Sequence, residues 1–97
     1  MRVIYKYTFP IDDVFMLFNI PFDYRVLHID LQKERPTMWI EHSVPGELAN
    51  LVDIRFRVLG TGHHFTLLPS DGEHLGTVLL YNGMQVYHIY GQRTLKK

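Results

Sequence analysis

Residues 75–90 read LGTVLLYNGMQVYHIY, two short apolar runs on either side of Asn82 and Gly83. An Asn-Gly pair is the preferred connection of a two-residue β-hairpin, because both residues accept a positive φ. The sequence therefore predicts antiparallel strands over residues 75–81 and 84–90, joined by a type I′ turn. We therefore expect a β-hairpin near the end of the chain, and this hairpin favours β structure in the segments before it.

The turn also fixes the register of this hairpin, so that each residue of one strand faces a known residue of the other. Both faces then carry apolar side chains, namely Leu75, Leu79, Tyr81, Val86 and Tyr90 on one, and Val78, Leu80, Tyr87 and Ile89 on the other. An antiparallel sheet in a small protein normally leaves one face to water. Two alternatives follow: a second layer of the same chain covers the extra face, or Val78, Leu80, Tyr87 and Ile89 form an interface with another molecule, such as a second copy of the chain.

The segments before the hairpin also have the composition and punctuation of short strands. The most regular alternation is in residues 52–58, and the other segments are 3–9, 14–20, 24–32 and 37–42. Residues 14–20 could instead form a short helix capped by Asp12 or Asp13, but Pro21 ends the segment early, which favours a strand. We therefore expect an all-β domain, a small antiparallel sandwich or barrel of about seven strands in a meander-like order.

Composition limits the classes of protein to which this chain can belong. The 97 residues are 46% hydrophobic, enough for one domain over residues 1–97, and we expect the polar tail 91–97 to be flexible. The lack of cysteine excludes disulfides and thiolate chemistry. Ten basic and ten acidic side chains cancel, which disfavours nucleic-acid binding and leaves little repulsion between copies. No apolar run approaches a membrane span, and the first residues lack a signal-peptide pattern.

The strand of residues 52–58 is followed by glycine-flanked Thr61 and two adjacent histidines. Successive backbone N–H groups in such a turn can form an anion-binding concavity, and two arginines lie on the outward side of the preceding strand. We predict a site for a phosphate or carboxylate formed by Arg55, Arg57, Gly60, Thr61, Gly62, His63 and His64. The alternative is a sharp turn with solvated histidines, the commoner use of such glycines.

The sequence contains no catalytic or metal-binding motif that we can identify. The sequence lacks the glycine spacing of a phosphate-binding loop and of a dinucleotide-binding fingerprint. Its histidines do not have the spacing of a paired metal-ligand motif. His88 is expected to be half-buried and hydrogen-bonded opposite Thr77. The close carboxylate pairs fall in turns, where they usually accept hydrogen bonds from turn amides. We expect no catalytic residues, no metal and no cofactor.

Short pieces along the whole chain carry a resemblance to a family. They are Ile4-Tyr5-Lys6-Tyr7, Ile20-Pro21, Val26-Leu27, Pro36-Thr37-Met38-Trp39, Arg55-Phe56, Gly60-Thr61-Gly62-His63, Gly76-Thr77 and Val86-Tyr87-His88. The chain resembles an unnamed family of small bacteriophage proteins of unknown function that share a Gly-Thr-Gly-His string, although His64 stands where that family has proline. The resemblance implies a phage product in the bacterial host cytoplasm and brings no activity.

These observations favour a small, non-enzymatic binding protein that acts on a host component. It would be either an inhibitor that grips a host defence protein or a homo-oligomeric sponge for a small anionic nucleotide. One alternative is a minor structural or assembly protein of the virion. A second is a small hydrolase or nuclease centred on His63, with Arg57 and Asp71.

Overall fold

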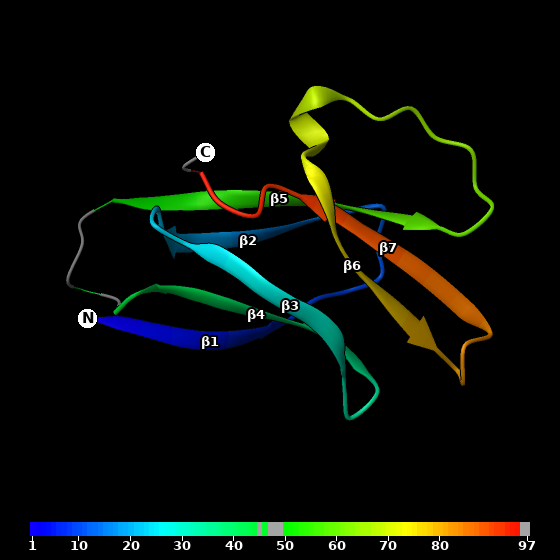
Figure 1. The fold of residues 1–97 in the computed structure, drawn as a ribbon, viewed down its shortest axis with the longest axis horizontal. Helices are drawn as coiled ribbons and strands as arrows, with labels where there is room; N and C mark the ends of the chain where they lie inside the picture. Colours follow the sequence, from blue (N-terminus) through cyan, green and yellow to red (C-terminus); the bar gives the residue numbers. More distant parts are fainter. Residues whose placement is uncertain (45, 47–49, 96–97) are drawn as a thin grey trace.

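The computed structural model describes residues 1–44, 46 and 50–95. This part of the chain forms strands β1 (Arg2–Thr8), β2 (Val14–Pro21), β3 (Arg25–Gln32), β4 (Arg35–Ser43), β5 (Leu51–Gly60), β6 (Glu73–Leu80) and β7 (Gln85–Gly91), and the short 3₁₀ helix η1 (Pro69–Asp71) (Figure 1). The all-β prediction is confirmed. Residues 14–20, where a helix was the alternative, belong to strand β2.

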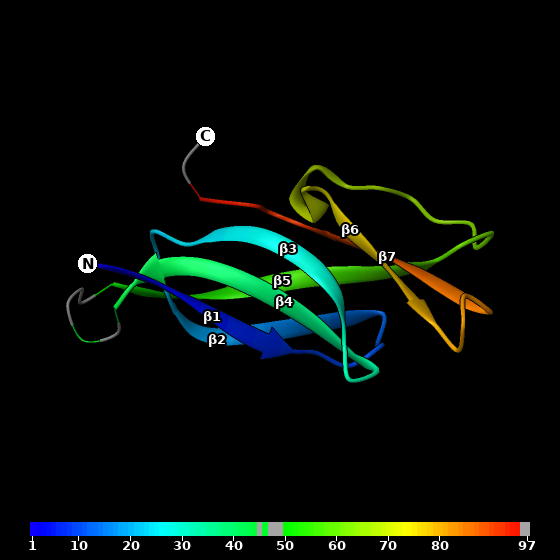
Figure 2. The same ribbon diagram turned by 60° about the horizontal axis from the view of Figure 1, so that its bottom comes forward.

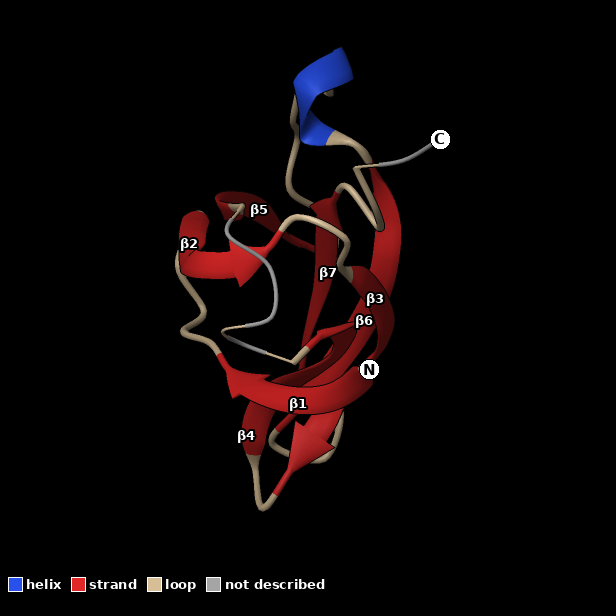
Figure 3. Cartoon of the chain, turned by 90° about the vertical axis from the view of Figure 1, so that its left-hand side faces the viewer, coloured by secondary structure: helices blue, strands red, loops and turns tan. Residues whose placement is uncertain are grey.

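The strands form two antiparallel sheets that pack face to face as a sandwich (Figure 2). One sheet has the order β1-β4-β3 and the other the order β2-β5-β7-β6. The expected meander-like order is wrong, because only β3–β4 and β6–β7 are pairs of strands that are consecutive in the chain and adjacent in a sheet. Viewed along the long axis, the strands lie around the core, and η1 stands outside both sheets (Figure 3).

The core lies between the sheets and is built from the inward side chains of nearly every strand. Phe15 stacks between Phe9 and Phe56, with ring centroids 4.6 and 4.9 Å away. Val78 and Ile89 are fully buried in the same cluster. The first sheet thus covers the inner face of the hairpin, so the alternative that made Val78 and Ile89 an interface is wrong for these two residues. Leu80 and Tyr87 are half-buried.

The two sheets approach each other closely where β6 passes β3. A Cβ placed on Gly76 would lie only 2.9 Å from the Cβ of Ile29. The two strands therefore approach through a position that has no side chain. This contact brings the two sheets together at the β6 edge of the sandwich.

The C-terminal hairpin has the predicted register, with Leu79 opposite Val86 and Thr77 opposite His88. Its turn has positive φ at Tyr81, Asn82 and Gly83. A β-bulge between His74 and Gly76 changes the faces, however. It turns Leu75 into the core, so the outer face of β6 and β7 carries His74, Thr77, His88 and Tyr90 and is less apolar than the sequence indicated.

The segment after β7 pairs with the start of β3 as far as Thr94, while the flexibility of the tail 91–97 stays a prediction. The Tyr24 hydroxyl donates to the carbonyl of Gln92, at 3.1 Å, and the Val26 N–H donates to the carbonyl of Arg93, at 2.8 Å. Thr94 forms a bridge with Arg25. The rest of the predicted tail, residues 96–97, lies outside the described residues.

A buried histidine is held between two neighbours inside the sandwich. His42 has no exposed surface, and its Nδ1 lies 2.7 Å from the carbonyl oxygen of Ser43. Because a carbonyl oxygen only accepts, Nδ1 carries the hydrogen, and the Tyr7 hydroxyl donates to Nε2 at 2.9 Å. Burial raises the pKa of Tyr7, so this donor stays protonated.

Replacing Tyr7 by phenylalanine should leave a buried acceptor on His42 without its donor. We expect Tyr7→Phe to lower the free energy of unfolding by about 1–3 kcal/mol in urea denaturation. Tyr5 packs its ring edge-on against the same histidine and is 43% exposed, so Tyr5→Phe should change stability by less than about 0.5 kcal/mol. Equal losses in the two variants would contradict this role for the Tyr7 hydroxyl.

Candidate functional site

A long loop leaves the end of β5, arches back above this strand in the view of Figure 1 and returns through η1 to β6. Every residue from 61 to 70 is exposed. We call residues 61–72 the β5–β6 loop. Because residues 61–70 include no buried side chain, we expect the shape of the loop to depend on a few polar contacts with the sheet.

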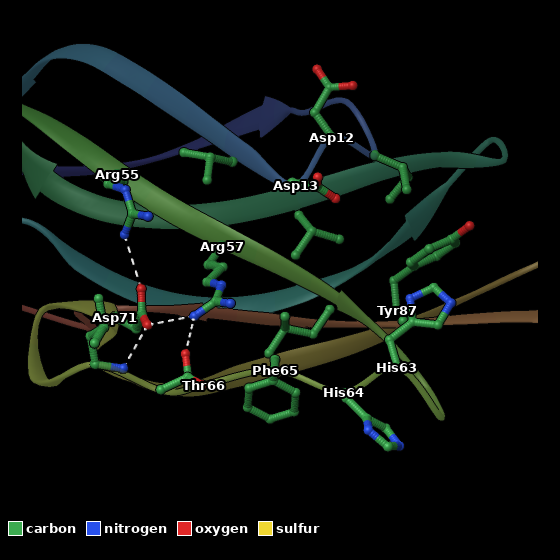
Figure 4. A pocket seen from close by; sticks show the side chains of 16 residues that line it. Asp12, Asp13, Arg55, Arg57, His63, His64, Phe65, Thr66, Asp71 and Tyr87 are labelled. Atoms are coloured by element: carbon green, nitrogen blue, oxygen red, sulfur yellow. Dashed lines mark hydrogen bonds and ion pairs between the residues drawn. The ribbon is translucent and has the colours of Figure 1, made fainter.

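Asp71 makes the strongest of these contacts (Figure 4). Its carboxylate has no exposed surface and accepts hydrogen bonds from Nη1 of Arg55 at 3.0 Å, Nη1 of Arg57 at 2.8 Å and the N–H of Leu68 at 2.8 Å. The Leu68 N–H first, and then the two guanidinium groups, lower the pKa of Asp71 to about 2. Alternation along β5 turns both arginines outward, toward the returning loop. We call this group the Asp71 clamp.

The clamp extends to the middle of the loop through Arg57. Its Nη1 also donates to the carbonyl of Thr66 at 2.6 Å, and its guanidinium group lies 5.9 Å from the centre of the Phe65 ring. The Phe65 ring in turn contacts Tyr90 of β7, with centroids 6.3 Å apart. The second half of the loop is therefore fixed to the sheet.

The start of the loop is held by a second anchor. The Thr61 hydroxyl lies 2.8 Å from Nε2 of His88, and the Thr61 N–H donates to the carbonyl of Val86 at 3.1 Å. The His63 N–H donates to the carbonyl of Gly60 at 3.1 Å, and Gly62 has a φ of +86°. Two N–H groups of the predicted anion site thus donate to carbonyl groups of the protein itself, as expected for the alternative of a sharp turn.

A cavity of about 760 Å³ lies between this loop and the turn before β2. Five of the seven predicted ligand-binding residues line it, namely Arg55, Arg57, Gly60, His63 and His64. Thr61 lines a separate hollow of about 440 Å³, where it lies beside Met84 at the hairpin tip. The seventh, Gly62, lines neither hollow. The structure therefore brings the arginines and histidines of the sequence prediction to one cavity.

Carboxylate groups outnumber guanidinium groups in this cavity. The two guanidinium groups share it with the carboxylates of Asp12, Asp13 and Asp71. Asp71 neutralises part of the arginine charge, and Figure 4 shows Asp12 and Asp13 on the opposite side of β5 from Asp71. Each arginine nevertheless keeps guanidinium N–H groups beyond the Nη1 that the clamp uses.

The comparisons with known proteins identify a family. One family model matches residues 1–97. The chain belongs to this family, DUF7352, described as a domain of unknown function. No curated protein and no solved structure shows a significant similarity to it. Function in this DUF7352 chain must therefore be argued from its own geometry.

Within the described residues of this DUF7352 domain, no group of three metal-ligating side chains gathers, and no helix has the length and apolar character needed to cross a membrane. The hydrolase alternative required Asp71 beside His63 and Arg57. A buried carboxylate with a pKa of about 2, bound by both arginines, is a poor proton carrier near neutral pH. The geometry thus disfavours an acid–base role for Asp71.

Sequence reasoning missed two features of this DUF7352 domain. Asp71 accepts from the N–H of Leu68, as expected of a carboxylate in a turn, but its bonds with Arg55 and Arg57 of β5 are not predicted by the sequence. The exposed apolar residues of the loop, Phe65, Leu67 and Leu68, were not singled out. The signal for an exposed position is that these apolar residues lie in a segment flanked by glycine and proline, which is typical of a loop.

Protonation of Asp71 should weaken the clamp at low pH. Its folded pKa of about 2 lies below the ordinary value of 3.8, so its contribution is complete above about pH 4 and is lost as the pH falls toward 2. We expect Asp71→Asn to lower the melting temperature at pH 7 and to reduce the loss of stability between pH 4 and 2. Asp12→Asn, at an exposed position, should keep the wild-type pH profile. A wild-type profile in Asp71→Asn, measured by thermal melting, would contradict the clamp.

Proposed function

We propose that this protein is a non-enzymatic binding protein that grips a partner protein with the β5–β6 loop. The observation that carries the proposal is the exposure of three large apolar side chains on one tethered loop: Phe65 at 47%, Leu67 at 45% and Leu68 at 53%. Exposed apolar groups that gather on one segment are typical of interaction sites.

The two anchors of the loop support this proposal. Thr61 binds His88 at the start of the loop, and Asp71 binds Arg55 and Arg57 at its end. A loop held in one conformation loses less entropy when it binds, so its contacts contribute more to affinity. Binding residues on loops that a rigid sheet positions are a common arrangement in proteins.

The tip of the β6–β7 hairpin adds to the same surface. Tyr81 is 70% exposed and Met84 is 86% exposed. Met84 lines the hollow of about 440 Å³ that also contains Thr61 and His63, so the tip lies beside the start of the loop. Tyrosine, phenylalanine and methionine are enriched where proteins meet. Loop and tip together provide an apolar, aromatic contact surface.

The resemblance to small bacteriophage proteins suggests the partner. We infer that the protein is made in an infected bacterium and acts in the host cytoplasm on a host component. An inhibitor of a defence protein needs only to occupy a functional surface, which a small domain without catalytic groups can do. The zero net charge of the chain fits a contact dominated by apolar groups rather than by charge steering.

A second candidate function is the binding of a small anionic nucleotide in the cavity of about 760 Å³. The guanidinium N–H groups that the clamp leaves free support it, together with His63 and His64. Asp12 and Asp13 in the same cavity oppose it. We therefore place it second.

Calorimetric titration with cyclic and linear nucleotides tests this second candidate. The nucleotide-binding candidate requires saturable binding that weakens in the double variant His63→Ala/His64→Ala. Both histidines are exposed in the wild type. The protein-binding proposal predicts no binding across the nucleotide series. Saturable binding that depends on the two histidines would reverse the order of the two candidates.

The partner should be identified by cross-linking and then measured directly. A photo-crosslinking phenylalanine analogue in place of Leu67, in bacterial cells, should trap one protein. The purified partner should then bind Leu67→Ser at least about 30-fold more weakly than wild type, as expected for a central apolar contact. Leu27→Ser is the matched control, since Leu27 is 40% exposed on β3, and it should bind as wild type does. Equal affinity of the Leu67 variant and wild type would contradict the proposal.

A further inference from the structure

Two histidine side chains meet on the outer face of the β6–β7 hairpin. Nε2 of His74 lies 3.4 Å from Nδ1 of His88, and the rings have centroids 5.6 Å apart. The Thr77 hydroxyl oxygen lies 3.1 Å from the first nitrogen and 3.0 Å from the second. Three potential donor atoms thus form a small triangle that points away from the core.

The fold produces this triangle through two local features. The hairpin register places Thr77 opposite His88, and the β-bulge before Gly76 brings His74 to the same face. Tyr90 packs edge-on against the His74 ring, with centroids 5.4 Å apart and an interplanar angle of 83°. The His74 ring is therefore positioned from the side by an aromatic neighbour.

The contact with Thr61 bears on which nitrogen of His88 carries the hydrogen. Its hydroxyl oxygen lies 2.8 Å from Nε2 of His88 and can accept the hydrogen of that nitrogen. Nδ1 then presents a lone pair toward Nε2 of His74. The Thr77 hydroxyl has one hydrogen, so it can donate to only one of these two nitrogens at a time. A metal-ligating histidine usually donates its second ring N–H to an oxygen acceptor such as a carboxylate, a backbone carbonyl or a water, and the Thr61 hydroxyl oxygen would take that place here.

The separation of the two nitrogens also suits a metal ion. In tetrahedral coordination with metal–nitrogen bonds of about 2.0–2.1 Å, two ligand nitrogens lie about 3.3–3.4 Å apart. The distance between His74 and His88 has this value without any rearrangement. Neutral imidazoles are good ligands for zinc, copper and nickel.

We propose that His74 and His88 form a chelating site for a divalent transition-metal ion, with Thr61 as a positioning residue. The ion would bind Nε2 of His74 and Nδ1 of His88, and water or a group from another molecule would complete its coordination. The described residues supply only two histidines at this place, so the site is open. Copper should bind more tightly than zinc, following the general order of affinities for nitrogen ligands.

The test is calorimetric titration of the full chain, purified without a histidine tag, with Cu²⁺ and separately with Zn²⁺. We expect one saturable ion per chain, lost in His74→Ala and in His88→Ala. Thr61→Val should bind about 10–100-fold more weakly. The matched control is His63→Ala/His64→Ala, which removes two exposed histidines from the neighbouring loop and should bind as wild type does.

A second readout locates the ion independently of affinity. Paramagnetic Cu²⁺ should broaden the amide NMR signals of residues 74 and 88 first, and the unchanged spectrum elsewhere reports that each variant is folded. Saturable binding that is lost with either histidine supports the proposal. Three results overturn it: no saturable binding by wild type, equal binding by His74→Ala, or loss of binding in the His63→Ala/His64→Ala control.

Discussion

The carboxylate of Asp71 is buried on the outer face of a sheet, where two guanidinium groups and one backbone N–H donate to it. This contact joins a loop whose residues 61–70 are all exposed to the strand β5. Burying one member of a charge group is favourable only when its partners are in place, because an unpaired buried charge is costly. The conformation of the β5–β6 loop, and with it the exposed apolar surface, therefore depends on Asp71.

The site is a consequence of strand geometry. Alternation along β5 sends Phe56 into the core and Arg55 and Arg57 to the outside, so the clamp and the core are built by adjacent residues of one strand. Across the same sheet, the bulge in β6 brings His74 beside His88. Thr61 connects the two regions, because it begins the loop and contacts His88.

Features set by local chemistry could be predicted from the sequence. The Asn82-Gly83 turn determined the hairpin register, and the position of Pro21 favoured a strand over a helix for residues 14–20. The strand order could not be predicted in this way, since β1–β4 and β2–β5 pairing depends on contacts between segments far apart in the chain. A strict alternation also cannot show a bulge, which is why Leu75 was assigned to the wrong face.

The sequence revealed only part of the site, because some of its contacts join residues that are far apart in the chain. The arginines and loop histidines singled out in the sequence line one cavity, and their role in binding stays a prediction. Sequence reasoning missed that Asp71, 14 residues beyond Arg57, folds back to accept from it. The contacts of Gln92 and Arg93 with Tyr24 and Val26 could not be predicted either, since they are made with a distant segment.

The backbone motion of the β5–β6 loop in the unmodified protein tests the central claim most directly. If the anchors at Thr61 and Asp71 hold the loop, nitrogen-15 relaxation should give order parameters near about 0.85 for the amides of residues 65–68, as in the strands. Values below about 0.6 for these amides would show that the loop moves freely on the nanosecond timescale. The loop would then have no fixed surface to present.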